Sequence, residues 1–298
     1  MSRSVEVFQV DAFTRQRFAG NPAGVVLDAD HLDDREKQAI ARELNNGDTA
    51  FIGAPTSDDH DVSIRFFTPR VEASFVGHAT LAAHAVLNAR EPRPLRRQRG
   101  KTGIVEVTAL SDGAGFAIRQ PPAPLGRLPT GDETDEVLEL LGLHHEQLDP
   151  ACPPQIAGSA STRMLLGLRD AADLATVKAQ PSKLAALSGR IGAQGYFLFS
   201  RRGAADRCDT EARMFCPALG IDEDPVSGNA HGMLGVYLQQ RQLLVASGST
   251  ARFSGAQGRH VGRPGRVDVS LALDANAHAT AVTLAGQAVI VFQTRIEL

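Results

Sequence analysis

The sequence predicts an α+β protein built from two similar halves. Many short segments alternate apolar and polar residues, as half-buried strands do, and only a few segments have the period of a helix. The pattern Arg-x-Phe-x-Pro also occurs twice, at residues 65–69 and 213–217, each time before an acidic loop, a glycine and an apolar helix pattern. The simplest interpretation is a duplicated loop-to-helix unit. The alternative is a chance match between two ordinary strand–turn–helix units.

In the first half, a helix is expected from Asp33 or Asp34 to Leu44, because an aspartate can cap it and Asn45-Asn-Gly47 can stop it. A second helix should begin at Gly77 and run to about Ala89. The strands expected here lie at residues 5–10, 23–27, 49–52, 61–67, 103–109 and 115–119. The proline-rich run at 120–124 marks a domain boundary.

In the second half, helices are expected at residues 132–141, 171–186 with an interruption at Pro181, and 230–240. The strands expected here are 163–168, 194–200, 211–215 and 266–273, followed by 281–284 and 287–296 as a hairpin over Ala285-Gly286. The helices that follow the two repeats are apolar all round. Such helices belong in the interior, so we expect strands to wrap around each of them.

Composition excludes several classes of protein. A net charge of −3 over 298 residues argues against a nucleic-acid surface. The basic run at residues 92–101 is short, and we interpret it as a solvated connection between elements. No apolar run is long enough for a membrane span, and the N-terminus resembles no export leader. Three cysteines without a CxxC pair fit a reducing, cytoplasmic location.

The two predicted loop-to-helix junctions are candidate binding sites. A helix N-terminus presents free backbone N–H groups and a partial positive charge, both of which suit a carboxylate. If the two repeats face one cleft, both junctions could hold the same small acid. The sequence contains no HExxH motif, no Cys/His cluster, no P-loop and no strand–GxGxxG–helix unit. We therefore expect neither a metal nor a nucleotide cofactor.

Several motifs together resemble the PhzF-like family, whose best-known type is the phenazine-biosynthesis isomerase. They are Phe18-Ala-Gly-Asn-Pro-Ala23, Ile40-Ala-Arg-Glu-Leu44, Arg65-x-Phe-Thr-Pro69, Gly77-His-Ala-Thr80 and Glu223-Asp-Pro-Val-Ser-Gly228. Gln257-Gly258, Gly262-Arg-Pro-Gly265 and Gly286-Gln287 continue the likeness near the C-terminus. The resemblance covers nearly the whole chain, in the order expected for the family.

This resemblance implies a diaminopimelate-epimerase-like fold, in which two pseudo-symmetric halves are each a curved, mostly antiparallel sheet around a central helix. The implied halves are residues 1–122 with 279–298, and residues 123–278. It further implies a homodimer and a cofactor-independent isomerase. The type enzyme shifts a double bond in a dihydro-hydroxyanthranilate by moving a proton between two ring carbons.

The resemblance also assigns candidate site residues. Asp48 takes the position of the family's glutamate acid/base, and His78 aligns with a histidine that contacts the substrate. Asp224 aligns with the acidic residue of the Glu-Asp-Pro motif and is expected to bind the substrate or to orient His78. The expected substrate-binding residues are Gly77, Ser227, Gly228 and Asn229. His231, two residues beyond Asn229, is expected to be structural.

Two departures from the family pattern leave alternatives open. Asp48 is one methylene shorter than the usual glutamate, and Asn229 replaces a serine. The protein is therefore either an isomerase acting on a small cyclic or unsaturated amino or hydroxy acid, or a binding or scaffold protein that has lost turnover. A third alternative is an epimerase or racemase with non-thiol bases, since no cysteine lies beside Gly77 or Gly228.

Overall fold

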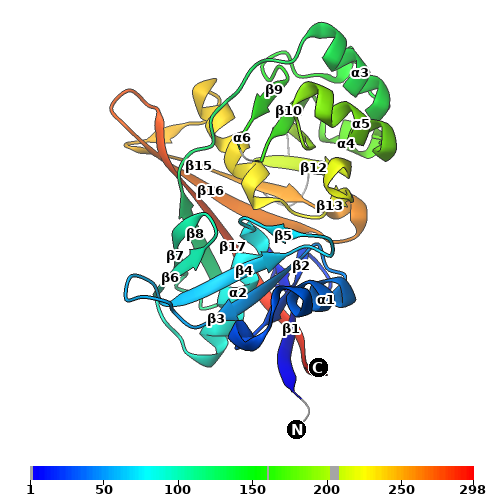
Figure 1. The fold of residues 1–298 in the computed structure, drawn as a ribbon. Helices are drawn as coiled ribbons and strands as arrows, with labels where there is room; N and C mark the ends of the chain where they lie inside the picture. Colours follow the sequence, from blue (N-terminus) through cyan, green and yellow to red (C-terminus); the bar gives the residue numbers. More distant parts are fainter. Residues whose placement is uncertain (1–2, 160, 202–207) are drawn as a thin grey trace. The chain divides into compact units, whose positions relative to one another are not determined.

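A computed structural model describes residues 3–159, 161–201 and 208–298 of the chain. It divides into two compact units, Met1–Gln120 with Ala285–Leu298 (unit 1) and Pro121–Leu284 (unit 2). The sequence places these boundaries after residues 122 and 278, and the structure places them after residues 120 and 284. Unit 1 is therefore completed by the last residues of the chain (Figure 1).

Unit 1 is a curved sheet that is antiparallel except where β2 pairs with β3 and β4 pairs with β6. Its strands are β1 (Ser4–Ala12), β2 (Asn21–Val26), β3 (Asp48–Gly53), β4 (Val62–Phe67), β5 (Glu72–Ala73), β6 (Leu95–Gly100), β7 (Gly103–Ala109), β8 (Gly115–Gln120) and the end of β17 (Ala279–Glu297). The helices are α1 (Asp34–Leu44) and α2 (Gly77–Arg90). Helix α1 packs on β3 and β4.

Unit 2 repeats this plan and carries more helices. Its strands are β9 (Gln155–Ala157), β10 (Arg163–Leu168), β11 (Tyr196–Ser200), β12 (Thr210–Cys216), β13 (Ile221–Asp224), β14 (Ala246–Ser247), β15 (Thr250–Gln257), β16 (Gly265–Leu273) and the start of β17. The helices are α3 (Gly131–Leu141), α4 (Ala171–Thr176), α5 (Pro181–Ile191) and α6 (Gly228–Gln240). The predicted interruption at Pro181 is the gap between α4 and α5, because proline fits the first turn of a new helix.

Each unit is organised around one buried helix, as the apolar patterns predict. Helix α2 is buried from Ala79 through Val86 without a break, and it packs on β1, β2, β3 and β8. Helix α6 is buried from Ala230 through Gly235 and packs on β15 and β16. The prediction of an α+β fold with a curved sheet around a central helix in each half is confirmed.

The interpretation of residues 92–101 as a solvated connection was wrong. Strand β6 occupies most of this run and pairs with β7 along its length. Two of its polar side chains point inward, Arg96 at 4% exposure and Gln98 at 1%. Each finds a partner, Arg96 at the Glu91 carbonyl oxygen and Gln98 at His84, 3.0 Å away. Polar residues can therefore fill core positions here, which the charge pattern conceals.

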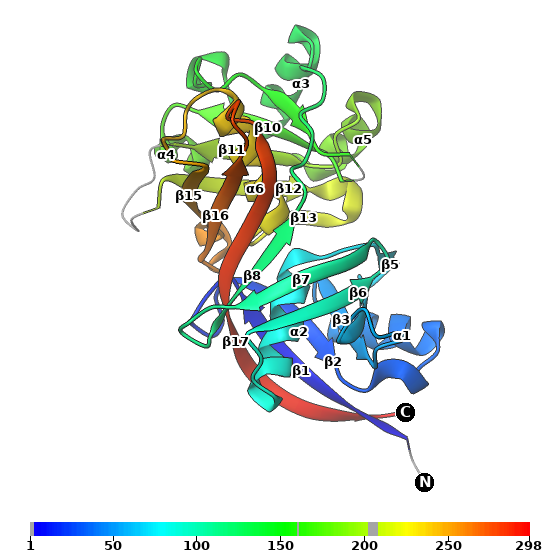
Figure 2. The same ribbon diagram turned by 90° about the vertical axis from the view of Figure 1, so that its left-hand side faces the viewer.

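The predicted hairpin over Ala285-Gly286 was also wrong. Strand β17 continues through both residues, and its end pairs with β1 from Ala288 to Glu297 (Figure 2). Gly286 is needed for space and not for a turn. A Cβ at this position would overlap the Phe13 ring and lie 3.2 Å from Leu81 Cδ2. The glycine thus marks a close approach between strand and core rather than a reversal of the chain.

We expect Gly286→Ala to lower the free energy of unfolding by about 1–3 kcal/mol, because an extra methyl group in a filled core forces neighbours to move. Gly47→Ala in the same unit is a matched control, since no atom lies within 4 Å of the position of its Cβ. The measurement is the denaturant midpoint of both variants. Equal midpoints would show that the contact with Phe13 is not tight.

Candidate active site

Asp48 is positioned by the end of α1. The helix begins with a reciprocal cap between Asp33 and Glu36, in which the Glu36 amide donates to the Asp33 carboxylate at 2.8 Å. It ends at Asn45, whose left-handed φ of 50° turns the chain back toward the sheet. Asp48 is then the first residue of β3, beside Ala23 of β2, and is only 7% exposed. A carboxylate is thereby held at the buried end of a strand.

His78 lies next to Asp48 and is the second residue of α2. Its Nε2 atom is 3.8 Å from Asp48 Oδ2, and each side chain is 11% exposed. Burial lowers the pKa of His78 to about 4, so the imidazole is neutral at neutral pH. Within the described part of the chain, Nε2 makes no hydrogen bond. The structure thus brings two predicted site residues together as a carboxylate beside a neutral imidazole.

The start of α2 adds backbone donors to this pair. Val76 is the N-cap and offers no capping side chain, so the first amides of the helix, those of Gly77 and His78 among them, lack intrahelical partners. Thr80 closes the first turn by donating its hydroxyl to the Val76 carbonyl oxygen at 2.8 Å. Free amides at a helix N-terminus favour an anion.

The corresponding junction of unit 2 carries the other predicted residues. Asp224 ends β13 and pairs with Met214 of β12. Ser227 is the N-cap of α6, and its hydroxyl accepts a hydrogen bond from the Ala230 amide at 3.4 Å. Gly228 is buried and is the first residue of the helix. Ser227 therefore shapes the junction, and its role as a substrate contact stays a prediction.

Two polar side chains follow Gly228 on the first turn of α6. The Asn229 Oδ1 atom is buried and, among the residues described, accepts no hydrogen bond. His231 is fully buried, donates from Nδ1 to the Ser227 carbonyl oxygen at 2.8 Å, and packs edge-on against Phe197. Burial lowers the pKa of His231 to about 4. These contacts agree with a structural role for His231 and leave Asn229 as an acceptor at the junction.

The repeated arginine has the same role in both units, which the sequence pattern did not suggest. Arg65 donates to Glu72 at 2.8 Å and stacks over Phe67 at 5.1 Å. Arg213 donates to both oxygens of Glu223 at 2.9 and 2.7 Å and stacks over Phe215 at 4.9 Å. Each arginine fixes the strand that leads to its junction. The glutamate within each acidic loop was the signal that could have revealed these pairs.

The seven predicted residues therefore lie in two groups, one in each unit, which we name half-site 1 and half-site 2. Half-site 1, in unit 1, holds Asp48, Gly77 and His78. Half-site 2, in unit 2, holds Asp224, Ser227, Gly228 and Asn229. That both half-sites serve one cleft stays a prediction from the repeat.

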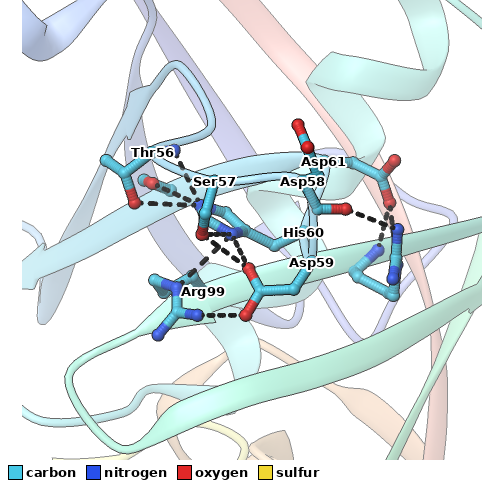
Figure 3. Close-up of polar contacts among 9 residues, drawn as sticks. Thr56, Ser57, Asp58, Asp59, His60, Asp61 and Arg99 are labelled. Atoms are coloured by element: carbon cyan, nitrogen blue, oxygen red, sulfur yellow. Dashed lines mark hydrogen bonds and ion pairs between the residues drawn. The ribbon is translucent and has the colours of Figure 1, made fainter.

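A third polar cluster, in the loop between β3 and β4, contains a histidine beside serines and aspartates (Figure 3). His60 Nδ1 lies 2.6 Å from Asp59, and Nε2 lies 3.1 Å from Ser63 Oγ. However, the Thr56 backbone N–H donates to Nε2 at 3.0 Å, so the nitrogen that a general base would use is occupied. The His60 side chain is also fully buried. We interpret this cluster as the internal support of the loop.

Two of the three cysteines, Cys152 and Cys216, are buried. Burial raises the pKa of the Cys216 thiol to about 12 and that of Cys152 to about 11, so neither forms a thiolate readily. In the described ranges, no three His, Cys, Asp or Glu side chains are grouped as metal ligands.

None of the described helices is both long and apolar enough to cross a membrane.

The fold and the paired junctions define a class, the epimerase-like α+β proteins in which each half wraps a sheet around one helix. The family model described as "Phenazine biosynthesis-like protein" matches residues 10–294. An uncharacterized isomerase of Clostridium acetobutylicum is 35% identical over 303 residues, covering 100% of both chains. The chain therefore belongs to the phenazine biosynthesis-like (PhzF) family and is an isomerase-type enzyme.

Solved structures agree with this assignment. The Bacillus anthracis phenazine biosynthesis protein of the PhzF family matches with a TM-score of 0.89 and 25% identity, over 99% of this chain and 100% of that one. A predicted epimerase from Pseudomonas aeruginosa matches with a TM-score of 0.81 and 26% identity, over 99% of both chains. The diaminopimelate-epimerase-like fold is thus shared along the whole chain.

Proposed function

We propose that this protein is a cofactor-independent isomerase that moves a proton, and with it a double bond, on a small cyclic or unsaturated amino or hydroxy carboxylic acid. The observation that carries the proposal is the buried Asp48 carboxylate beside the neutral imidazole of His78. In the proposed reaction, Asp48 takes a proton from an activated carbon, the double bond shifts, and the same carboxyl returns the proton to another carbon.

The neutral state of His78 supports this role for Asp48. A protonated histidine would form an ion pair with the carboxylate and reduce its basicity. A neutral imidazole does not offset the negative charge of Asp48, so the carboxylate keeps its basicity, while the imidazole can still hydrogen-bond the substrate. Its Nε2 atom, which makes no hydrogen bond among the described residues, has the capacity for this contact. We therefore assign proton transfer to Asp48 and substrate polarisation to His78.

Half-site 2 is proposed to hold the rest of the substrate. The amides at the start of α6 suit a carboxylate, and Asp224 suits an amine or hydroxyl donor. Asn229 Oδ1 is a second acceptor without a hydrogen bond in the described chain. These groups favour a substrate that carries a hydrogen-bond donor near its carboxylate. The homodimer and the cytoplasmic location stay predictions.

The test is hydrogen exchange into candidate substrates. The protein is incubated in D₂O with dihydro-hydroxyanthranilate and with a panel of small unsaturated amino and hydroxy acids, and NMR follows their protons. We expect an isomerised product, with deuterium at the new carbon to the extent that the proton held by Asp48 exchanges with D₂O before it is returned. Binding without exchange would favour the scaffold protein instead. Loss of optical rotation without a shifted double bond would indicate an epimerase or racemase.

A further inference from the structure

Gln257, at the end of β15, touches both sides of the turn that carries Asp224. Its Nε2 atom donates to the Asp224 carbonyl oxygen at 2.7 Å, and its Oε1 atom accepts from the Ser227 amide at 3.0 Å. The residue is 2% exposed, so neither contact competes with bulk water. A carboxamide is the side-chain group that offers a donor and an acceptor side by side without charge. One buried side chain thus spans residues 224–227.

The residue that follows Gln257 fits the same turn. Gly258 has a φ of 89°, which side chains rarely permit. A Cβ there would overlap the Arg263 carbonyl oxygen and lie 2.7 Å from the Pro225 carbonyl oxygen. The backbone at Gly258 therefore packs directly on the turn, and the pair Gln257-Gly258 acts as a template for it.

The internal repeat allows the position of Gln257 in unit 2 to be compared with the equivalent position in unit 1. In unit 1, Ser63 of β4 pairs with Arg99 of β6, and in unit 2, Glu211 of β12 pairs with Ala256 of β15, both in parallel. Matching Arg65 to Arg213 also matches Ser63 to Glu211, and therefore matches their partners Arg99 and Ala256. The next residue after each partner is Gly100 in unit 1 and Gln257 in unit 2. Unit 1 builds its strand–turn–helix junction with no side chain there.

We infer that Gln257 is a positioning residue that orients Asp224 and the first turn of α6 for the substrate. The fold of the repeat does not need it, yet it contacts both ends of the turn in half-site 2. Its action is indirect, since it contacts the backbone of Asp224 and of Ser227. The inference rests on the proposed function for its catalytic consequence, but the positioning itself can be measured without a substrate.

Two substitutions of similar size separate the two contacts. Gln257→Glu keeps an acceptor for the Ser227 amide and loses the donor to Asp224, whereas Gln257→Met loses both. The matched control is Gln155, a buried glutamine of the same unit at 6% exposure, whose Nε2 donates to the Gly126 carbonyl oxygen at 2.6 Å. Gln155→Glu and Gln155→Met repeat the loss of a buried amide away from half-site 2.

The first measurement is exchange of the Ser227 backbone amide by NMR. We expect it to speed up about tenfold in Gln257→Met, the effect of one lost hydrogen bond, and to change little in the Gln155 variants. The second is turnover of the substrate found in the D₂O panel. Here kcat should fall about 10-fold to 100-fold in Gln257→Glu, because a small misplacement of the bound substrate costs about this much. KM should rise as well, since half-site 2 is proposed to bind the substrate.

The outcomes separate the two proposals. If the wild-type protein turns over no candidate, the proposed function fails, and the Ser227 amide still decides the positioning role. An unchanged amide in Gln257→Met overturns the inference, and so does a kcat that falls equally in the Gln155 and Gln257 variants. A loss of stability shared by both pairs, with kcat reduced only at Gln257, supports it.

Discussion

The Asp48→Asn variant is expected to lose about 100-fold to 10,000-fold of the rate of proton transfer, the usual contribution of a positioned acid/base group. Asparagine keeps the size of the side chain and removes its ability to take a proton. The measurement is deuterium incorporation into the substrate by NMR, with the wild-type protein alongside. The effect is large because Asp48 is the carboxylate assigned both steps of the transfer.

Asp48→Glu is the informative companion. It restores the length usual in the family and retains the carboxylate, so we expect it to keep far more activity than the asparagine variant. Thermal unfolding of both variants checks that the fold is intact. Unchanged turnover in Asp48→Asn would assign the base to another residue, and Asp224→Asn would then be the next variant to measure.

The second large effect is a loss of stability on acidification. Burial holds the pKa of each of three histidines, His78, His84 and His231, at about 4, whereas an unfolded histidine has a pKa near 6.5. Between these values the unfolded chain binds more protons than the folded one, so the stability present above pH 6.5 falls as the pH drops toward 4. Each histidine contributes up to about 3 kcal/mol to this loss.

The loss should differ between the units, because His78 and His84 lie in unit 1 and His231 lies in unit 2. We expect the free energy of unfolding, followed by denaturant titration at each pH, to fall more steeply for unit 1. In His84→Gln one proton fewer is taken up on unfolding. The slope of the unfolding free energy against pH should therefore be smaller by up to about 1.4 kcal/mol per pH unit. The exposed His278, 75% accessible, is the control position. Equal slopes for wild type and His84→Gln would contradict this account.

Local signals predicted the elements near the site well. Asp33 and Asn45 gave the two ends of α1, and the strand expected from Thr49 begins one residue earlier, at Asp48. The all-round apolar pattern of α2 and α6 predicted their burial. The repeat of Arg65 and Arg213 predicted two equivalent junctions, although not the ion pairs that fix them.

What the sequence concealed depends on contacts between distant segments. Gln257 lies about thirty residues from the turn it supports, as the bond from the Ser227 amide shows, and no local rule relates a glutamine to such a turn. Strand β6 was hidden because its charged residues resemble a loop, while their burial depends on β4 and β7. The sequence predicted a turn at Gly286, whereas the structure shows that the Phe13 ring packs directly against this glycine. Long-range packing decides each case.

The pairing of β17 with β1 has a consequence for synthesis of the protein. The two strands run together from Ser4 opposite Glu297, and the Leu298 amide donates to the Arg3 carbonyl oxygen at 2.8 Å. The ribosome therefore finishes all of unit 2 before it supplies the strand that completes unit 1. Until then one edge of β1 stays open, and open edges of this kind invite pairing with other chains. Unit 1, whose first strand is translated first, is thus the last unit to receive all of its strands.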